Sequence, residues 1–206
     1  MGLAVEDPLI ERYQNSPKVL DKYYALYLLG RIHSEKGAPI LLEALKNPSP
    51  SVRWGAIRGL RYMMKPEYAP AVVALADDPV RSVRFDAIAT LEKADVPESL
   101  QKLAQITRTE QDQKLWSRAW VSLRFLNDVD GVVTEKYRYN RDLKLIPADD
   151  AHSEVGYTYY FVKVDEKGAV REFNLPMRVW KEVRAGDRLQ KGRQSEDFKI
   201  TPAAGG

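Results

Sequence analysis

The chain contains no cysteine, and this absence excludes several kinds of site at once. Disulfide bonds, thiolate nucleophiles and zinc sites with sulfur ligands all require that residue. A chain without cysteine is stable under oxidising and reducing conditions alike, so its composition leaves the cellular compartment open. Histidine is also scarce, because the sequence holds His33 and His152 and no others. Neither has a second histidine near it in sequence to complete a metal or catalytic set.

Long hydrophobic runs are missing as well. No apolar segment approaches the roughly 18 residues that a membrane-spanning helix needs. The segment from Met1 to Asp7 lacks both the basic region and the apolar region of a secretory signal peptide. We therefore expect a cytoplasmic location by default, and a periplasmic or envelope-associated one if a leader has been removed ahead of Met1.

Neither charge sign dominates, and the common catalytic motifs are absent. The formal net charge is +3 over 206 residues, whereas nucleic-acid-binding proteins usually carry a marked basic excess. The sequence has no glycine-rich phosphate loop, no nucleophile elbow, no His-Glu-x-x-His motif and no EF-hand loop. We predict no catalytic residues, no metal site and no cofactor, and we expect a protein that is not an enzyme.

What the sequence has instead is an internal repeat of 31 residues. Segments 23–29, 54–60 and 85–91 align at this offset, and segment 117–123 follows at an offset of 32. A fixed period in this range is typical of solenoids, in which similar units stack on one another.

Each repeat predicts two helices. Val52, Ala56, Gly59 and Leu60 recur at helical spacing, and the small residues on this face, with Gly55 beside them, allow a neighbouring helix to approach closely. The predicted long helices lie near 18–32, 51–63, 81–93 and 113–126, the short ones near 38–46, 68–77 and 96–107, and a leading helix near 7–15.

Proline-containing turns separate the repeats. Asn47-Pro48 and Asp78-Pro79 end the short helices, because proline disfavours helical geometry in the residue before it. Ser51 and Ser82 are predicted to cap the long helices that follow.

These residues resemble a known family. The segment Ser51-Val52-Arg53-Trp54-Gly55-Ala56-Ile57-Arg58-Gly59-Leu60 is similar to the short HEAT-like repeats first noted in phycobiliprotein lyases, and the segment 78–84 resembles their inter-repeat turn. The resemblance covers residues 16–126 and implies an α-solenoid of HEAT-like helix pairs. It leaves function open, because such repeats occur in lyases, DNA-repair proteins and adaptors, and no residue specific to bilin attachment can be carried over.

The composition changes after Asn127, where β-branched and aromatic residues replace the helical pattern. The predicted strands are 132–139, 157–164, 169–175, 188–191 and 197–200, with a helical turn between Pro176 and Val183. Five short strands in about 70 residues predict a small SH3- or OB-like antiparallel β-barrel. The expected fold is therefore multidomain α and β, with an α-solenoid at 1–128, a small β-barrel at 129–200 and a tail at 201–206.

The order of these β segments also resembles a small bacterial domain to which no chemistry is assigned. Members of that family often occur at the cell envelope. The matching residues are Val132, Val133, Tyr159, Tyr160, Phe161, Glu172, Phe173, Trp180, Gly186, Asp187 and Leu189.

The leading functional hypothesis is a non-catalytic protein-interaction scaffold, or adaptor, whose partner is another protein of unknown identity. We expect the partner to bind outward positions of the short helices: Glu43, Lys46, Asp77, Lys102 and Gln105.

The alternative is nucleic-acid binding through an arginine and aromatic ladder formed by Arg53, Trp54, Arg58, Arg61 and Arg84. Lys22, Arg53 and Arg84 occupy equivalent repeat positions, as do Tyr23, Trp54 and Phe85. The competing structural interpretation is that the cations bind loop carbonyls or an aspartate of the adjoining repeat, while the aromatic rings pack between long helices.

A third possibility is a ligand or metal site in the β-barrel. The segment from Asp149 to Glu154 places carboxylates beside His152, although a polar loop has the same composition. Trp116 and Trp120 lie on the last long helix, and we expect them to pack against the β half or the third repeat.

Overall fold

The computed structural model describes residues 5–140, 144–147 and 159–203, and the chain separates into two compact units. Unit 1 comprises Met1–Arg108 and unit 2 comprises Thr109–Gly206. The sequence predicted a division at residue 128, whereas the contacts place the last long helix, 113–126, with the sheet. None of the described helices is long and apolar enough to cross a membrane.

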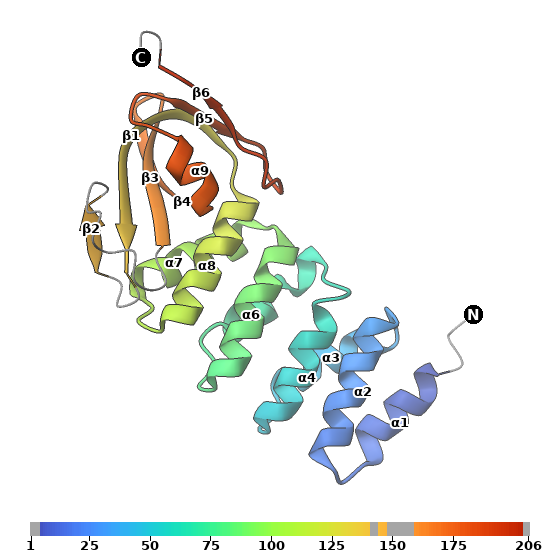
Figure 1. Ribbon diagram of the computed structural model, residues 1–206. Coiled ribbons are helices and arrows are strands. Elements are labelled where there is room, and N and C mark those ends of the chain that lie inside the picture. The colour runs from blue at the N-terminus through green and yellow to red at the C-terminus, as the bar shows by residue number, and fades with distance from the viewer. Residues whose placement is uncertain (1–4, 141–143, 148–158, 204–206) are drawn as a thin grey trace. The chain divides into compact units, whose positions relative to one another are not determined.

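Unit 1 is a stack of helix pairs (Figure 1). Long helices α2, α4 and α6 follow one another, and α2 contacts α4 as α4 contacts α6, while the shorter α3 and α5 pack beside them. The elements are α1 (Glu6–Asn15), α2 (Val19–Arg31), α3 (Gly37–Ala44), α4 (Pro50–Leu60), the 3-10 turn η1 (Pro66–Tyr68), α5 (Ala69–Leu75), α6 (Arg81–Ala94) and α7 (Pro97–Thr109). This arrangement confirms the predicted helical repeats.

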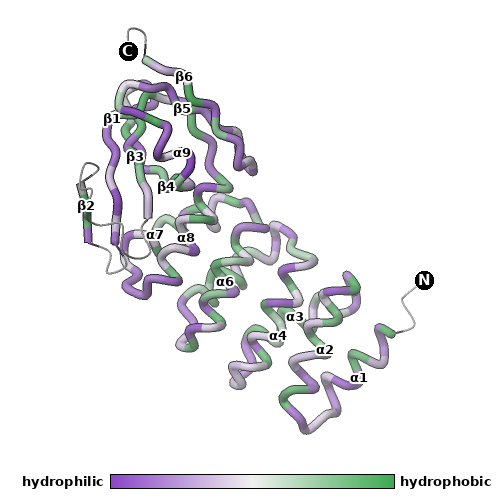
Figure 2. Tube along the Cα trace, in the orientation of Figure 1, coloured by the Kyte–Doolittle hydropathy of each residue, from purple (hydrophilic) through white to green (hydrophobic). Residues whose placement is uncertain are grey.

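The core of unit 1 forms from one apolar face of each helix. Hydrophobic and hydrophilic residues alternate along these helices in Figure 2, as expected for helices that bury one side. Leu26, Leu41, Ile57 and Leu60 are fully buried between successive helices. Each pair therefore hides its apolar face against its neighbours, which is the physical basis of a solenoid.

Glycine allows α2 and α4 to pack with their backbones nearly in contact. A Cβ atom on Gly30 would lie 2.1 Å from the carbonyl oxygen of Gly59, and one on Gly59 would lie 2.6 Å from that of Leu26. A Cβ atom on Gly55 would lie 2.8 Å from the carbonyl oxygen of Tyr23. The close approach predicted from the small residues of the second repeat is thus present.

The predicted helix caps are wrong. Helix α4 follows Ser49 and α6 follows Val80, so Ser51 and Ser82 lie inside the first turns, and the Ser49 side chain does not cap α4. The turns are instead held by the residues that precede the prolines. Asn47 Oδ1 accepts the Ser49 N–H at 2.9 Å, and Asp78 Oδ1 accepts the Val80 N–H at 2.8 Å.

The described residues of unit 2 form two helices and an antiparallel sheet with the strand order β4-β3-β1-β5-β6, and β2 pairs with β1. Its elements are α8 (Gln113–Leu126), β1 (Val129–Tyr139), β2 (Leu145–Pro147), β3 (Tyr159–Glu166), β4 (Ala169–Leu175), α9 (Met177–Glu182), β5 (Arg188–Lys191) and β6 (Lys199–Thr201). The short strand β2 was not predicted from sequence. Thr201, assigned to the tail, forms the end of β6.

The prediction of a closed barrel is also wrong, because the sheet remains open. Closure requires hydrogen bonds between the two end strands. Among the described residues, β4 pairs with β3 alone and the three-residue β6 pairs with β5 alone. Helix α9 covers one face of the open sheet. Val179 and Trp180 of this helix, and Val183 just after it, pack in one buried cluster with the sheet residues Val162 and Val164.

A β-bulge distributes the side chains of β1 between two clusters. Val133 belongs to the cluster under α9, and Tyr137 belongs to the cluster that contains Trp116 of α8. Residues four apart share a face in a regular strand, but the register of β1 against β3 shifts between Val133 and Glu135. Unit 2 therefore has α9 on one face of the sheet and α8 on the other.

Trp116 and Trp120 pack against the β half, as one of the two predicted placements required. Their rings lie 5.7 Å and 4.8 Å from the ring of Phe161, and Trp116 also contacts Tyr139 and Tyr159. Arg124 Nη1 ties the same helix to β4 by donating to Asn174 Oδ1 at 2.9 Å. These contacts explain why α8 groups with the sheet.

Candidate functional site

Arg53 of α4 is a structural residue of the repeat. Its Nε and Nη2 atoms donate to the two carboxylate oxygens of Asp78 at 2.7 and 3.0 Å, and Nη1 donates to the carbonyl oxygens of Asn47 and Pro48. The Arg53 side chain is 11% exposed and that of Asp78 is 3% exposed. Arg53 therefore binds both kinds of partner that the structural interpretation of the sequence expected: loop carbonyls and an aspartate of the adjoining repeat.

The other two members of the cation ladder also make contacts within the unit. Arg84 Nη1 donates to the carbonyl oxygens of Asp78 and Pro79 at 2.9 and 3.2 Å. The Lys22 ammonium lies over the ring of Tyr13, 5.8 Å from its centre. Arg53 is therefore paired with a carboxylate, and Arg84 uses one of its nitrogens on the carbonyl oxygens of the turn, as the structural interpretation expected.

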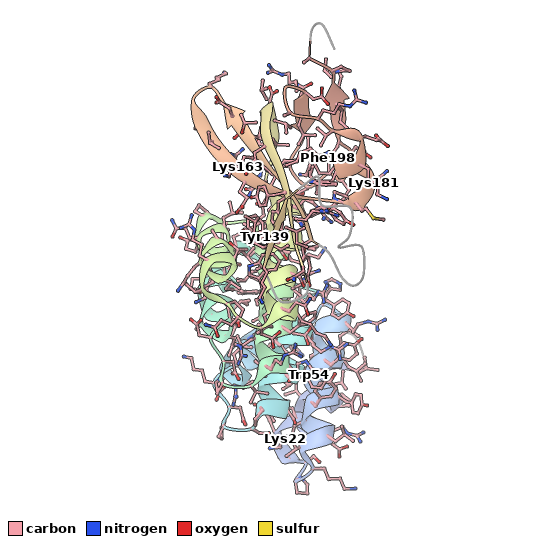
Figure 3. All side chains as sticks on the ribbon, turned by 60° about the vertical axis from the view of Figure 1, so that its left-hand side comes forward. Lys22, Trp54, Tyr139, Lys163, Lys181 and Phe198 are labelled. Carbon is pink, nitrogen blue, oxygen red and sulfur yellow. The ribbon has the colours of Figure 1, made fainter. Side chains whose placement is uncertain are left out.

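A different surface gathers aromatic and basic side chains on α2, α4 and the residues just after α4. We call it the aromatic–arginine surface, and it consists of Tyr23, Tyr24, Tyr27, Arg31, Trp54, Arg58, Arg61 and Tyr62. Figure 3 shows Trp54 in the part of unit 1 where α2 and α4 lie side by side. The Tyr23 and Trp54 rings are 5.3 Å apart, so two of the three ladder aromatics pack between long helices as expected.

Arg58 is the centre of this surface. Its Nη1 atom donates to the Tyr23 hydroxyl at 2.7 Å, and its guanidinium lies 5.3 Å from the Tyr27 ring and 5.4 Å from the Trp54 ring. No described carboxylate lies within ion-pairing distance of it. The side chain is half-buried and held in one orientation, yet its charge is not neutralised by an acid of unit 1.

Two tyrosines connect Arg58 to Arg31. The hydroxyls of Tyr27 and Tyr62 are 3.2 Å apart, and Arg31 Nη1 donates to the Tyr27 hydroxyl at 3.2 Å. The hydrogen bonds with Tyr62 and Arg31 lower the pKa of Tyr27, and the bond to Tyr27 raises the pKa of Tyr62. The phenols and guanidiniums of neighbouring repeats therefore form one connected group.

The surface contains two depressions. One, which we call the cationic pocket, has a volume of about 330 Å³ and is lined by Arg58, Arg61, Tyr62 and Lys93. The other, which we call the apolar groove, has a volume of about 430 Å³ and is lined by Val19, Leu20, Tyr23, Tyr24, Ser51 and Trp54. The two adjoin, because Arg58 of the pocket contacts Tyr23 and Trp54 of the groove.

One carboxylate faces this arrangement from α6. Asp86 accepts a hydrogen bond from Trp54 Nε1 and lies 4.0 Å from Arg61 Nη1. It balances one of the three cations of the pocket, so the pocket keeps a positive charge. Such a site can bind an anionic group.

Large apolar and aromatic side chains are exposed around the two depressions. Leu20 is 62% exposed, Tyr24 51% and Tyr62 43%. Phe85, the third aromatic of the ladder, is 39% exposed, so the expectation that all three aromatics are packed between helices holds for Tyr23 and Trp54 but not for Phe85.

The short-helix positions named from sequence differ in exposure. Glu43, Lys46, Asp77 and Gln105 are exposed. Lys102 is buried, with its side chain 8% exposed and its ammonium on Asp77, and it also donates to Gln105 Oε1 at 3.3 Å. Lys102 is therefore a packing residue and not an outward one.

Among the described residues, no group of histidines and carboxylates could hold a metal ion. The segment from Asp149 to Glu154, with His152, lies outside the described residues. His33 follows α2 in a left-handed conformation, and its backbone N–H donates to the Gly30 carbonyl oxygen.

Five residues of the surface and its pocket were not predicted from the sequence: Tyr24, Tyr27, Arg31, Tyr62 and Lys93. The repeat offset itself could have found three of them, because Arg31, Tyr62 and Lys93 occupy equivalent positions 31 residues apart. Equivalent positions of stacked helices lie on one face, so a polar or aromatic series at the offset marks a surface.

A sequence profile of the HEAT repeats matches residues 6–92 and again residues 39–124. The chain belongs to the HEAT repeat family. Repeats of this family are commonly protein-interaction scaffolds and are typically non-catalytic. No curated protein matches the chain.

Proposed function

We propose that this protein is a non-catalytic adaptor that binds another protein through the aromatic–arginine surface of unit 1. The observation that carries the proposal is the concentration of Tyr, Trp and Arg around two adjoining depressions on consecutive repeats. These three residue types dominate the energetic centres of protein interfaces. Membership of the HEAT repeat family supports the same function.

The arginine at the centre of the surface is already held by its neighbours. Arg58 is held by Tyr23, Tyr27 and Trp54, so little side-chain entropy remains to be lost when a partner binds. Leu20 and Tyr24 supply apolar area at the edge of the groove that is exposed in the chain alone. The exposed short-helix residues Glu43, Lys46, Asp77 and Gln105 offer a second candidate surface, which lacks comparable aromatic side chains.

Site-specific photo-crosslinking in extracts of the native cells tests the proposal. A benzophenone amino acid replaces Tyr24 or Tyr62 on the aromatic–arginine surface, and Glu43 or Gln105 on the short helices as matched exposed controls. We expect one discrete adduct from Tyr24 and Tyr62, which mass spectrometry identifies and the purified partner forms again. Adducts from Glu43 and Gln105 alone would move the contact to the short helices. No discrete adduct from any of the four positions would contradict the adaptor function.

A further inference from the structure

We infer that the partner presents an acidic segment with a bulky apolar side chain, whose carboxylates enter the cationic pocket while the apolar side chain fills the apolar groove. This inference rests on the proposed function and specifies the chemistry of the partner. It commits to a protein segment, because the same surface combines unneutralised cations with exposed apolar area.

Charge complementarity is the first argument. Arg58, Arg61 and Lys93 line the pocket, and the carboxylate that faces them from within unit 1 is that of Asp86, 4.0 Å from Arg61. Among the described residues, Arg58 and Lys93 have no carboxylate within ion-pairing distance. A carboxylate brought by a partner would meet a guanidinium that is already oriented, and such charge-assisted bonds are the strong ones.

The adjoining groove is the second argument. Val19, Leu20 and Tyr24 are exposed beside the partly buried Trp54. Covering these side chains removes apolar area from water, which a partner made of charge alone would not do. Because Arg58 contacts both Tyr23 and Trp54, one short segment can reach the pocket and the groove together.

The third argument separates a protein from a nucleic acid. A nucleic-acid backbone is bound by cations spread along its length, each contacting a phosphate. Arg53 and Arg84, which would extend the cations along the repeats, are engaged with Asp78 and with loop carbonyls. Arg58, Arg61 and Lys93 instead line a single depression, which fits a short cluster of carboxylates better than an extended backbone of phosphates.

Selection from a displayed library of random 12-residue peptides on the full-length protein tests the inference. We expect enriched peptides to carry several Asp or Glu residues close to a Leu, Phe, Tyr or Trp. Their affinity should fall several-fold between about 0.05 and 0.5 M NaCl, because screening shortens the reach of exposed charges.

Two matched variants place the binding on this surface. The variant R61E/K93E reverses two exposed cations of the pocket, and R108E/K114E makes the same change in net charge at exposed positions outside both candidate surfaces. We expect the selected peptides to bind R61E/K93E about tenfold more weakly or worse, and R108E/K114E nearly as well as wild type. L20D, at a residue that is 62% exposed, should weaken binding through the groove. Circular dichroism confirms that each variant is folded.

The outcomes distinguish this inference from the adaptor function. Enriched peptides that are not acidic, or that bind R61E/K93E as tightly as wild type, overturn the acidic segment while leaving the crosslinking test of the adaptor unaffected. A selection that enriches nothing also overturns it. A labelled 20-nucleotide strand that binds more tightly than the selected peptides, and loses that affinity in R61E/K93E, would replace the acidic segment with nucleic acid.

Discussion

At the scale of single residues, charge is used in two ways in unit 1. Arg53 and Asp78 bury their charges against each other and against backbone carbonyls, so they hold one turn of the solenoid together. Arg58 is oriented by a phenol and two aromatic rings and has no acid opposite it among the described residues. Arg53 is therefore not available to a partner, whereas Arg58 can still pair with a carboxylate that a partner brings.

The Arg53–Asp78 pair predicts a stability effect that depends on pH. Burial raises the pKa of Asp78, but the hydrogen bonds from Arg53 and the Val80 N–H and the charges of Arg53 and Arg84 outweigh it and hold the pKa below its ordinary value. The contribution of this carboxylate is therefore complete above its unfolded pKa of about 3.9 and is lost as the pH falls through the lower folded pKa. Arg53→Ala should lower the free energy of unfolding by about 2–4 kcal/mol at pH 6, because it leaves a buried, unpaired charge.

Urea unfolding at pH 6 and pH 3 measures this effect. At pH 3 the penalty of Arg53→Ala should shrink, since Asp78 of the variant is then protonated and carries no charge to desolvate. Arg12→Ala is the control, because the Arg12 side chain is 60% exposed in its pair with Asp21, and it should have a much smaller effect. An equal loss of stability at both pH values would mean that the Asp78 charge is not the cause.

At the scale of elements, the positions of the helices were predicted well from the sequence. Helical periodicity and repeat spacing can both be read along the chain without knowing which elements pack together. Helix α8 was predicted at 113–126 and spans those residues, and the strand predicted at 169–175 has those bounds in β4. The predicted caps at Ser51 and Ser82 were wrong because the side chains of Asn47 and Asp78 accept backbone hydrogen bonds in the turns, and the helices begin before the two serines. The bulge in β1 and the open sheet could not be read from residue type, because both depend on which strands pair.

The contact between α2 and α4 gives a prediction at the same scale. Gly30→Ala should lower the free energy of unfolding by about 1–3 kcal/mol or more, although alanine is the better helix former by about 1 kcal/mol. The added Cβ atom would lie 2.1 Å from the Gly59 carbonyl oxygen, and backbone atoms cannot move aside as a flexible side chain can. Gly192→Ala, where a Cβ atom meets nothing within 4 Å, is the matched control. Thermal denaturation of both variants measures the difference, and a stabilised Gly30→Ala protein would show that the helices do not approach so closely.

At the scale of the whole molecule, the sequence repeat and the structural units end at different places. The HEAT repeats match continues to residue 124, whereas unit 2 begins at Thr109 and includes α8. Repeat spacing reports which residues are equivalent, but it does not report which neighbour a helix packs against. The site was predictable in part: Arg58 and Arg61 were named, and Tyr62 and Lys93 stand in register with Arg31 at the 31-residue offset. The sequence does not show that Arg58, Tyr62 and Lys93 line one pocket, because that depends on contacts between successive repeats.

The start of unit 2 at Thr109, ahead of α8, predicts how the β half behaves when it is isolated. Residues 109–206 should fold on their own, with a near-ultraviolet circular dichroism signal and cooperative unfolding, because Trp116 and Trp120 cover Phe161 and Tyr137 of the sheet. Residues 129–206, cut at the boundary read from the sequence, should lose that signal, since removal of α8 exposes this aromatic cluster to water. Trp116→Ala within 109–206 keeps the chain length constant and should reduce the unfolding midpoint in the same direction. If 129–206 unfolds as cooperatively as 109–206 does, α8 is not part of the folding unit of the sheet and the division at residue 128 is the right one.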